Sequence, residues 1–95
     1  MKKDQIKKCS TIANNYGAEN QESQSVSELM ELGHVLTRRM DQRGPDWTDK
    51  LLDEMADVTI MIKQLQLLYG ITDSDLSDRI DYKLNRQIER IKGGV

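Results

Sequence analysis

Apolar residues recur every three or four positions along most of the chain, which is the spacing that places them on one face of an α-helix. The first such segment runs from about Lys3 to Tyr16 and ends at Gly17, the usual kind of residue just past a helix end. The second begins between residues 18 and 23 and continues to about Arg39. The expected apolar faces are Ile6, Cys9, Ile12, Ala13 and Tyr16 in the first helix, and Val26, Leu29, Leu32, Val35, Leu36 and Met40 in the second.

A third helix is expected after a short loop. Glycine and proline adjoin at Gly44-Pro45, which favours a loop over residues 42–46, and Asp46 or Thr48 is suited to cap the helix that follows. That helix is expected from about residue 49 to residue 68 and is apolar around most of its circumference. Such a helix has to be covered on most sides, which the other helices of so short a chain hardly achieve, so we expect a subunit interface.

The last helix is expected from about Asp73 to Lys92, opened by a capping box formed by Thr72 and Asp75. No stretch alternates in the way that a strand does. The pattern therefore predicts one all-α domain over residues 1–95, a bundle of four to five helices that assembles into an oligomer. The apolar stripe that the last helix is expected to contribute to the core is Leu76, Ile80, Leu84, Ile88 and Ile91.

The composition of the chain limits the kinds of partner and the cellular compartment that we expect. The 95 residues carry a net charge of −2, whereas a small nucleic-acid-binding domain shows a basic surface, so no nucleic acid is expected. The single cysteine, Cys9, cannot form an internal disulfide and fits a reducing compartment. No apolar run approaches the roughly 18 residues of a membrane span. We expect a cytoplasmic protein with no membrane contact.

Two acidic pairs with spacing three stand out, Glu28-x-x-Glu31 and Glu54-x-x-Asp57. Residues three apart lie on the same side of a helix, so each pair brings two carboxylates together beside an apolar stripe. Carboxylates in such surroundings are unfavourable unless they are paired or bind a metal. The two pairs therefore predict a site for a hard divalent cation, Mg²⁺ or else Mn²⁺.

A second metal motif overlaps the first pair. Glu31 and His34 form Glu-x-x-His, which occurs in di-iron helical bundles, but those bundles need the motif twice. A homodimer would be required to supply the second copy. We favour an exposed histidine near the helix end.

The acidic spacing resembles the signature of the MazG-like all-alpha nucleoside triphosphate pyrophosphohydrolases. The segments Tyr16-Gly17, Gln21, Glu31-Leu32, 54–58 and Lys83-Leu84-x-Arg86 also fit that pattern. The resemblance implies an enzyme that hydrolyses a nucleoside triphosphate to the monophosphate and pyrophosphate, as a homodimer or tetramer. It implies that Mg²⁺ is held by the four carboxylates. One of them, Glu31 or Glu54 for example, would be able to orient the attacking water instead of binding the metal. The implied metal and catalytic residues are Glu28, Glu31, Glu54 and Asp57.

The last helix also carries a basic stripe, Arg79, Lys83, Arg86 and Arg90, which is either a solvated face or a phosphate site. The resemblance favours phosphate binding by Lys83 and Arg86 only. Lys50 and Lys63, which flank the second acidic pair, are weaker candidates. Trp47 would either stack on a base or anchor the start of the third helix, and we favour the anchor. No base-binding residue is assigned.

Two other functions compete with this one. Phosphoribosyl-ATP pyrophosphohydrolases are related and similar in length, but they usually have a Tyr-His pair soon after the second acidic motif, where this chain has Ile60-Met61. A non-catalytic helical module for oligomerisation or regulation would keep the bundle and lose turnover. The presence of all four carboxylates favours the enzyme, whose nucleotide substrate the sequence leaves open.

Overall fold

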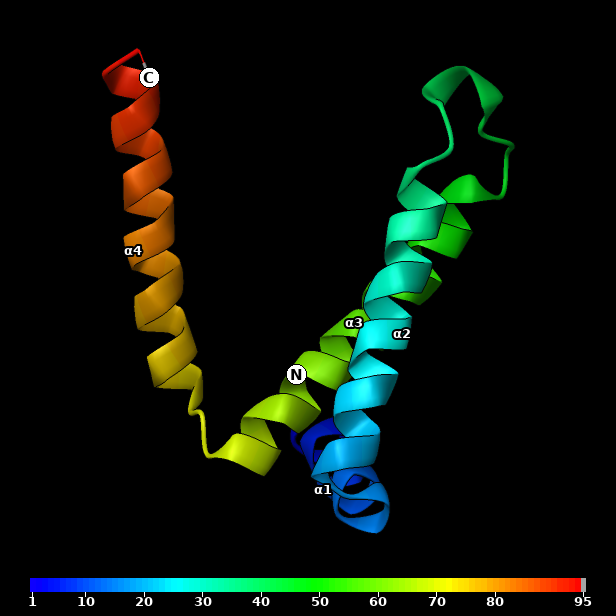
Figure 1. The fold of residues 1–95 in the computed structure, drawn as a ribbon, viewed down its shortest axis with the longest axis vertical. Helices are drawn as coiled ribbons and strands as arrows, with labels where there is room; N and C mark the ends of the chain where they lie inside the picture. Colours follow the sequence, from blue (N-terminus) through cyan, green and yellow to red (C-terminus); the bar gives the residue numbers. More distant parts are fainter. Residues whose placement is uncertain (95) are drawn as a thin grey trace.

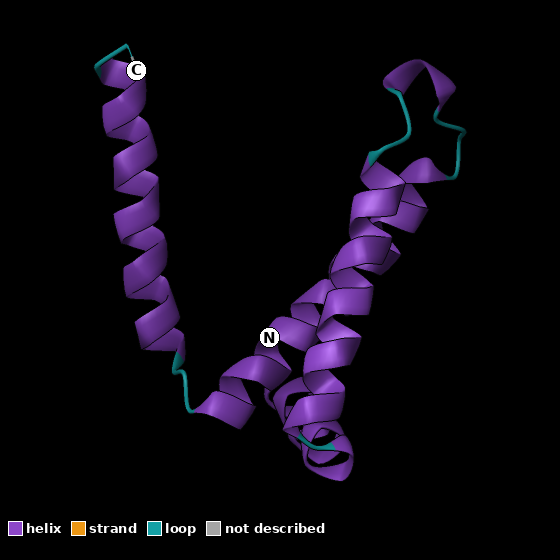
Figure 2. Ribbon diagram, in the orientation of Figure 1, coloured by secondary structure: helices purple, strands orange, loops and turns teal. Residues whose placement is uncertain are grey.

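The computed structural model describes residues 1–94, and every regular element in that range is helical (Figures 1 and 2). The prediction of an all-α chain is confirmed. None of the helices in residues 1–94 is long and apolar enough to cross a membrane. The elements are α1 (Lys3–Tyr16), α2 (Ala18–Leu36), the 3₁₀ turn η1 (Met40–Gln42), α3 (Trp47–Tyr69) and α4 (Asp73–Lys92).

The helix ends follow local chemistry. The bounds expected for α1 and α4 are confirmed, and the Thr72–Asp75 capping box forms with both of its hydrogen bonds, 3.0 and 3.1 Å long. Helix α2 stops at Leu36, three residues before the expected end, because the hydroxyl of Thr37 donates to the His34 carbonyl at 2.6 Å. Helix α3 begins two residues early, at Trp47, and the Asp46 side chain makes no capping bond to it.

Helices α2 and α3 form an antiparallel hairpin, with α1 packed against both (Figure 1). The start of α2 meets the end of α3, where Gln21 bonds Gln64, and the end of α2 meets Trp47. The residues along the line of contact, here called the α2–α3 seam, are buried or half-buried. The seam consists of Gln21, Ser25, Glu28, Leu32 and Val35 on α2, and of Leu51, Glu54, Val58, Met61, Leu65 and Leu68 on α3.

The predicted apolar face of α2 is therefore wrong in part. Leu32 and Val35 do lie in the seam, but Val26, Leu29, Leu36 and Met40 are exposed. The seam residues of α2 follow a four–three repeat that begins with a glutamine, a serine and a glutamate. Because these positions are polar, the repeat is hidden from a search for apolar periodicity.

Helix α4 extends away from the other three helices and packs along none of them (Figure 1). Its first residue is held by α3, where Lys63 Nζ contacts Asp73 Oδ1 at 2.6 Å and Gln66 Nε2 donates to the same oxygen at 2.9 Å. The expectation that the α4 stripe belongs to the core is wrong for the single chain. Ile80, Leu84, Ile88 and Ile91 are exposed, and Leu76 is half-buried.

Candidate active site

Three of the four predicted carboxylates converge at the middle of the α2–α3 seam. Glu28, Glu54 and Asp57 each offer a carboxylate oxygen, and these oxygens lie within 4.8 Å of one another. Glu28 and Glu54 face each other because both occupy seam positions, whereas Asp57 lies at the edge of the seam and is exposed. We call these three residues the carboxylate cluster. The spacing of the acidic pairs therefore identified residues that the fold brings together.

Glu31 lies beside the cluster and not within it. Three helical residues turn through about 300°, which leaves Glu31 about 60° away from Glu28 around the helix. Its side chain is exposed, and its charge still acts on Glu54. His34, a further step of three along α2, is exposed, as the sequence favoured, and is not part of the carboxylate cluster.

The cluster lacks a compensating charge. Within residues 1–94, Glu54 Oε2 is buried without a hydrogen-bond partner, and the ion pairs involve Asp41, Asp46 and Asp73 instead. Desolvation raises the pKa of Glu54, and the neighbouring charges of Asp57, Glu31 and Glu28 raise it further. Among residues 1–94, the cluster accepts one side-chain hydrogen bond, from Gln24 Nε2 to Glu28 Oε1 at 2.8 Å.

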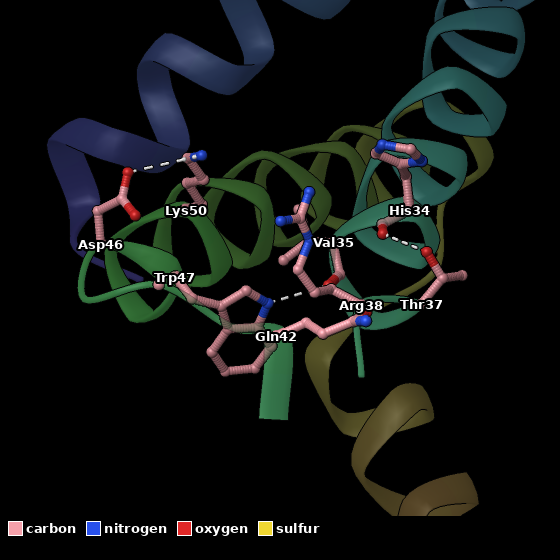
Figure 3. Close-up of a pocket in the computed structure, with 9 residues that line it drawn as sticks. His34, Val35, Thr37, Arg38, Gln42, Asp46, Trp47 and Lys50 are labelled. Atoms are coloured by element: carbon pink, nitrogen blue, oxygen red, sulfur yellow. Dashed lines mark hydrogen bonds and ion pairs between the residues drawn. The ribbon is translucent and has the colours of Figure 1, made fainter. Parts of the chain in front are cut away.

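A cavity of about 320 Å³ opens at the loop end of the hairpin (Figure 3). His34 approaches it from α2, Arg38 from the loop that follows α2, and Lys50 from α3. Lys50 Nζ is 3.5 Å from Asp46 Oδ2, an exposed pair that leaves the lysine free to exchange partners. We call this cavity the basic pocket, since three of its lining side chains carry nitrogen donors suited to an anion.

Trp47, the first residue of α3, lines the basic pocket and contacts the end of α2. Its Nε1 donates to the Val35 carbonyl at 3.0 Å (Figure 3). The Arg43 guanidinium lies 3.8 Å from the centre of the Trp47 ring. These contacts support the anchoring role that the sequence favoured.

A second cavity, of about 660 Å³, lies at the other end of the seam, between α1, α2 and α3. Gln21 and Gln64 lie at its base and are 5% and 1% exposed, and Gln21 Nε2 donates to Gln64 Oε1 at 2.6 Å. We call this cavity the amide pocket. Its lining residues are Ile12, Tyr16, Asn20, Gln21, Ser23, Gln24, Ser27, Met61 and Gln64.

The three sites lie along one side of the hairpin. Residues seven apart share a helix face, and α2 carries Gln24 and Glu31 at that spacing, with Arg38 just beyond its end. Helix α3 carries Gln64, Asp57 and Lys50 in the reverse order along the chain, as an antiparallel partner requires. Amides therefore lie at one end, carboxylates in the middle and basic groups at the other end. The seven-residue spacing within the helices was a signal by which Gln24 and Gln64 were identifiable from the sequence, whereas Arg38 lies after α2 and has no such signal.

The predicted phosphate-binding residues Lys83 and Arg86 are on α4, which leads away from the carboxylates of its own chain (Figure 1). Arg86 lies over Tyr82, with 5.9 Å between the guanidinium carbon and the ring centre. Lys63 is engaged with Asp73 at the base of α4. Of the basic residues considered from the sequence, only Lys50 lies beside the seam.

No protein-family model, curated protein or solved structure matches this chain.

Proposed function

We propose that the protein is a Mg²⁺-dependent pyrophosphohydrolase that cleaves a nucleoside triphosphate to the monophosphate and pyrophosphate. The observation that carries the proposal is the convergence of Glu28, Glu54 and Asp57 around a buried Glu54 oxygen with no hydrogen-bond partner in residues 1–94. The resemblance of the two acidic pairs to the MazG-like signature supports the same reaction.

The donor set fits a hard divalent cation. All the cluster ligands are carboxylate oxygens, and Mg²⁺ prefers oxygen and keeps several of its waters, so three protein oxygens are sufficient. Mn²⁺ accepts the same ligands. When bound, the ion would neutralise phosphate oxygens and make an attacking water more acidic.

The other polar residues near the cluster are assigned to different parts of the reaction and the substrate. Water attacks the α-phosphorus, the anhydride bond to the β-phosphate breaks, and its electron pair leaves with pyrophosphate. Glu31 is the carboxylate best suited to orient that water and accept its proton, since it is exposed beside the cluster and outside its ligand set. Lys50, two helical turns from Asp57 on α3, and Arg38, which lines the same pocket, would hold the pyrophosphate end.

The working form is proposed to be a homo-oligomer. Helix α4 exposes its apolar stripe, and α3 exposes Leu52 and Met55, so both helices carry surfaces that a second copy would cover. A second copy is also the means by which Lys83 and Arg86 would reach a set of carboxylates. The same exposed stripe favours the competing proposal, a non-catalytic oligomerisation module.

Pyrophosphate release tests the proposal. The purified protein is incubated with each of the common ribo- and deoxyribonucleoside triphosphates, and with phosphoribosyl-ATP, with and without Mg²⁺. We expect Mg²⁺-dependent release that Glu54→Gln and Asp57→Asn abolish with the helical circular dichroism preserved. Glu89→Gln, on exposed α4, removes the same charge far from the cluster and should leave turnover unchanged. Absence of release with every substrate would favour the non-catalytic module.

A further inference from the structure

The amide pocket has two hydrogen-bonding groups that the protein itself leaves unused. Gln21 and Gln64 are almost completely buried, and the one side-chain hydrogen bond that each makes in residues 1–94 is the bond between them. In the arrangement found, the Gln21 oxygen and the Gln64 nitrogen remain without a side-chain partner in residues 1–94. Neither atom is enclosed by protein, because Glu54 Oε2 is the one buried side-chain oxygen or nitrogen without a partner in residues 1–94, so both atoms are open to the pocket and available to a ligand.

The pattern that the pair offers does not depend on how the amides are oriented. If both amides were turned over, Gln64 would donate to Gln21, and the free groups would be the Gln64 oxygen and the Gln21 nitrogen. In either case the pocket presents one donor and one acceptor. The complementary ligand edge has an acceptor next to a donor, which is the pattern on the Watson–Crick edge of each nucleobase.

The rest of the pocket suits a flat heterocycle. Ile12 and Met61 supply apolar wall, and the Tyr16 ring, itself 57% exposed, lies at the rim where a base can stack. Asn20 and Gln24 add further amides around the opening.

The pocket also lies at the right place relative to the carboxylates. Gln24 lines it and at the same time bonds Glu28, and Gln64 is two helical turns from Asp57, or about 10 Å at 1.5 Å per residue. A ribose and the first phosphate span such a gap. The triphosphate would then continue past the carboxylate cluster to the basic pocket.

We propose that the amide pocket binds the base of the nucleotide, with Gln21 and Gln64 hydrogen-bonded to its Watson–Crick edge. The inference rests on the proposed function for the nature of the ligand. It further requires that the protein reject bases whose Watson–Crick edge is methylated. The methyl group replaces the N–H donor of guanine or uracil, or blocks the ring-nitrogen acceptor of adenine or cytosine, and it collides with the buried amides.

The test compares ligands with and without a base. Binding in Mg²⁺ is measured for the four nucleoside triphosphates, for their counterparts methylated on the Watson–Crick edge, and for inorganic triphosphate. We expect a preference for a nucleotide over inorganic triphosphate that Gln64→Met lowers about five- to ten-fold, as one lost hydrogen bond implies. Gln66→Met, a buried glutamine of the same helix outside the pocket, should leave that preference unchanged even if it loosens α4.

A spectroscopic readout on the unaltered protein guards against a variant that fails to fold. The side-chain amide signals of Gln21 and Gln64 should shift on addition of the preferred nucleotide and stay in place with inorganic triphosphate. If a nucleotide is hydrolysed but neither the signals nor the Gln64→Met preference change, the inference fails and the proposed function stands. If no nucleotide binds or moves these signals, both fail.

Discussion

In the proposed homo-oligomer, replacing Leu84 by alanine should shift the equilibrium toward monomer without unfolding the chain. Leu84 lies at the centre of the α4 stripe and is 57% exposed, between Ile80 at 47% and Ile88 at 48%. Full burial of such a side chain contributes about 1.5–3 kcal/mol, so covering the exposed half contributes about 1 kcal/mol. In a symmetric dimer the substitution acts twice, for a total loss of roughly 1–3 kcal/mol.

That loss corresponds to a dissociation constant about five- to a hundred-fold higher. The stripe alone is too small to hold two copies together, since association itself costs on the order of 4–15 kcal/mol. The proposed interface therefore requires further apolar surface, for which we propose the exposed Leu52 and Met55 of α3. The size of the Leu84 effect thus depends on both surfaces being covered together.

The assay is light scattering or sedimentation across a range of concentrations, from nanomolar to millimolar. Tyr82→Ala is the matched control, because Tyr82 is 58% exposed and lies about 160° around the helix from Leu84. The wild type and Tyr82→Ala should be oligomeric at micromolar concentration, and Leu84→Ala should be shifted toward monomer with unchanged circular dichroism. A wild-type mass of 10.9 kDa at every concentration, or equal effects of the two variants, would refute the reasoning.

Three further predictions concern the site. The raised pKa of Glu54 means that the folded state holds the proton of this carboxyl group more tightly than the unfolded state, so stability falls as pH rises through the ordinary pKa of 4.5. Glu54→Gln should therefore raise the melting temperature at pH 7 in the absence of metal and change it little below pH 4, which calorimetry would measure. Arg38→Ala should weaken inhibition by pyrophosphate by about 1.5–3 kcal/mol, the range for a hydrogen bond to a charged group, and an unchanged inhibition constant would exclude the basic pocket. Arg86→Ala should weaken triphosphate affinity in the oligomer by a similar amount and Arg90→Ala by much less, measured by calorimetry at fixed salt; equal small losses would identify the α4 stripe as a solvated face.

The helices and the carboxylates could be predicted from the sequence for different reasons. Helix α4 has a capping box at one end and a glycine pair at the other, and α1 stops at a glycine with φ of 86°, so local chemistry fixes those bounds. The acidic pairs were informative because a spacing of three keeps two carboxylates on one side of a helix. The spacing could not show that Glu28 lies in the cluster and Glu31 outside it. The two residues are about 60° apart around the helix, and that difference matters only once the position of the seam is known.

Two features of the fold could not be predicted from the pattern of apolar residues. The face of α2 that packs against α3 starts with Gln21, Ser25 and Glu28, so apolar periodicity selected the neighbouring exposed residues instead. The direction of α4 was also hidden, because an amphipathic stripe looks the same whether its partner is another part of the chain or another copy of it. Its departure from the bundle is set by side chains that have no periodicity, Lys63 and Gln66 on either side of Asp73.

The composition of the seam connects the fold to the chemistry. The apolar residues that are fully buried in residues 1–94 are few, namely Cys9, Ala13 and Met61, and the seam has carboxylates at its middle and the amide of Gln21 at one end. Groups of that kind weaken a core unless they are satisfied, and Glu54 is not satisfied by any protein atom in that range. A cation at the carboxylates would bind the folded hairpin and not the unfolded chain, and so would stabilise it in proportion to the logarithm of its concentration. If the seam were only structural, Mg²⁺ would leave the melting temperature unchanged, and Glu54→Gln would raise it equally with and without the ion.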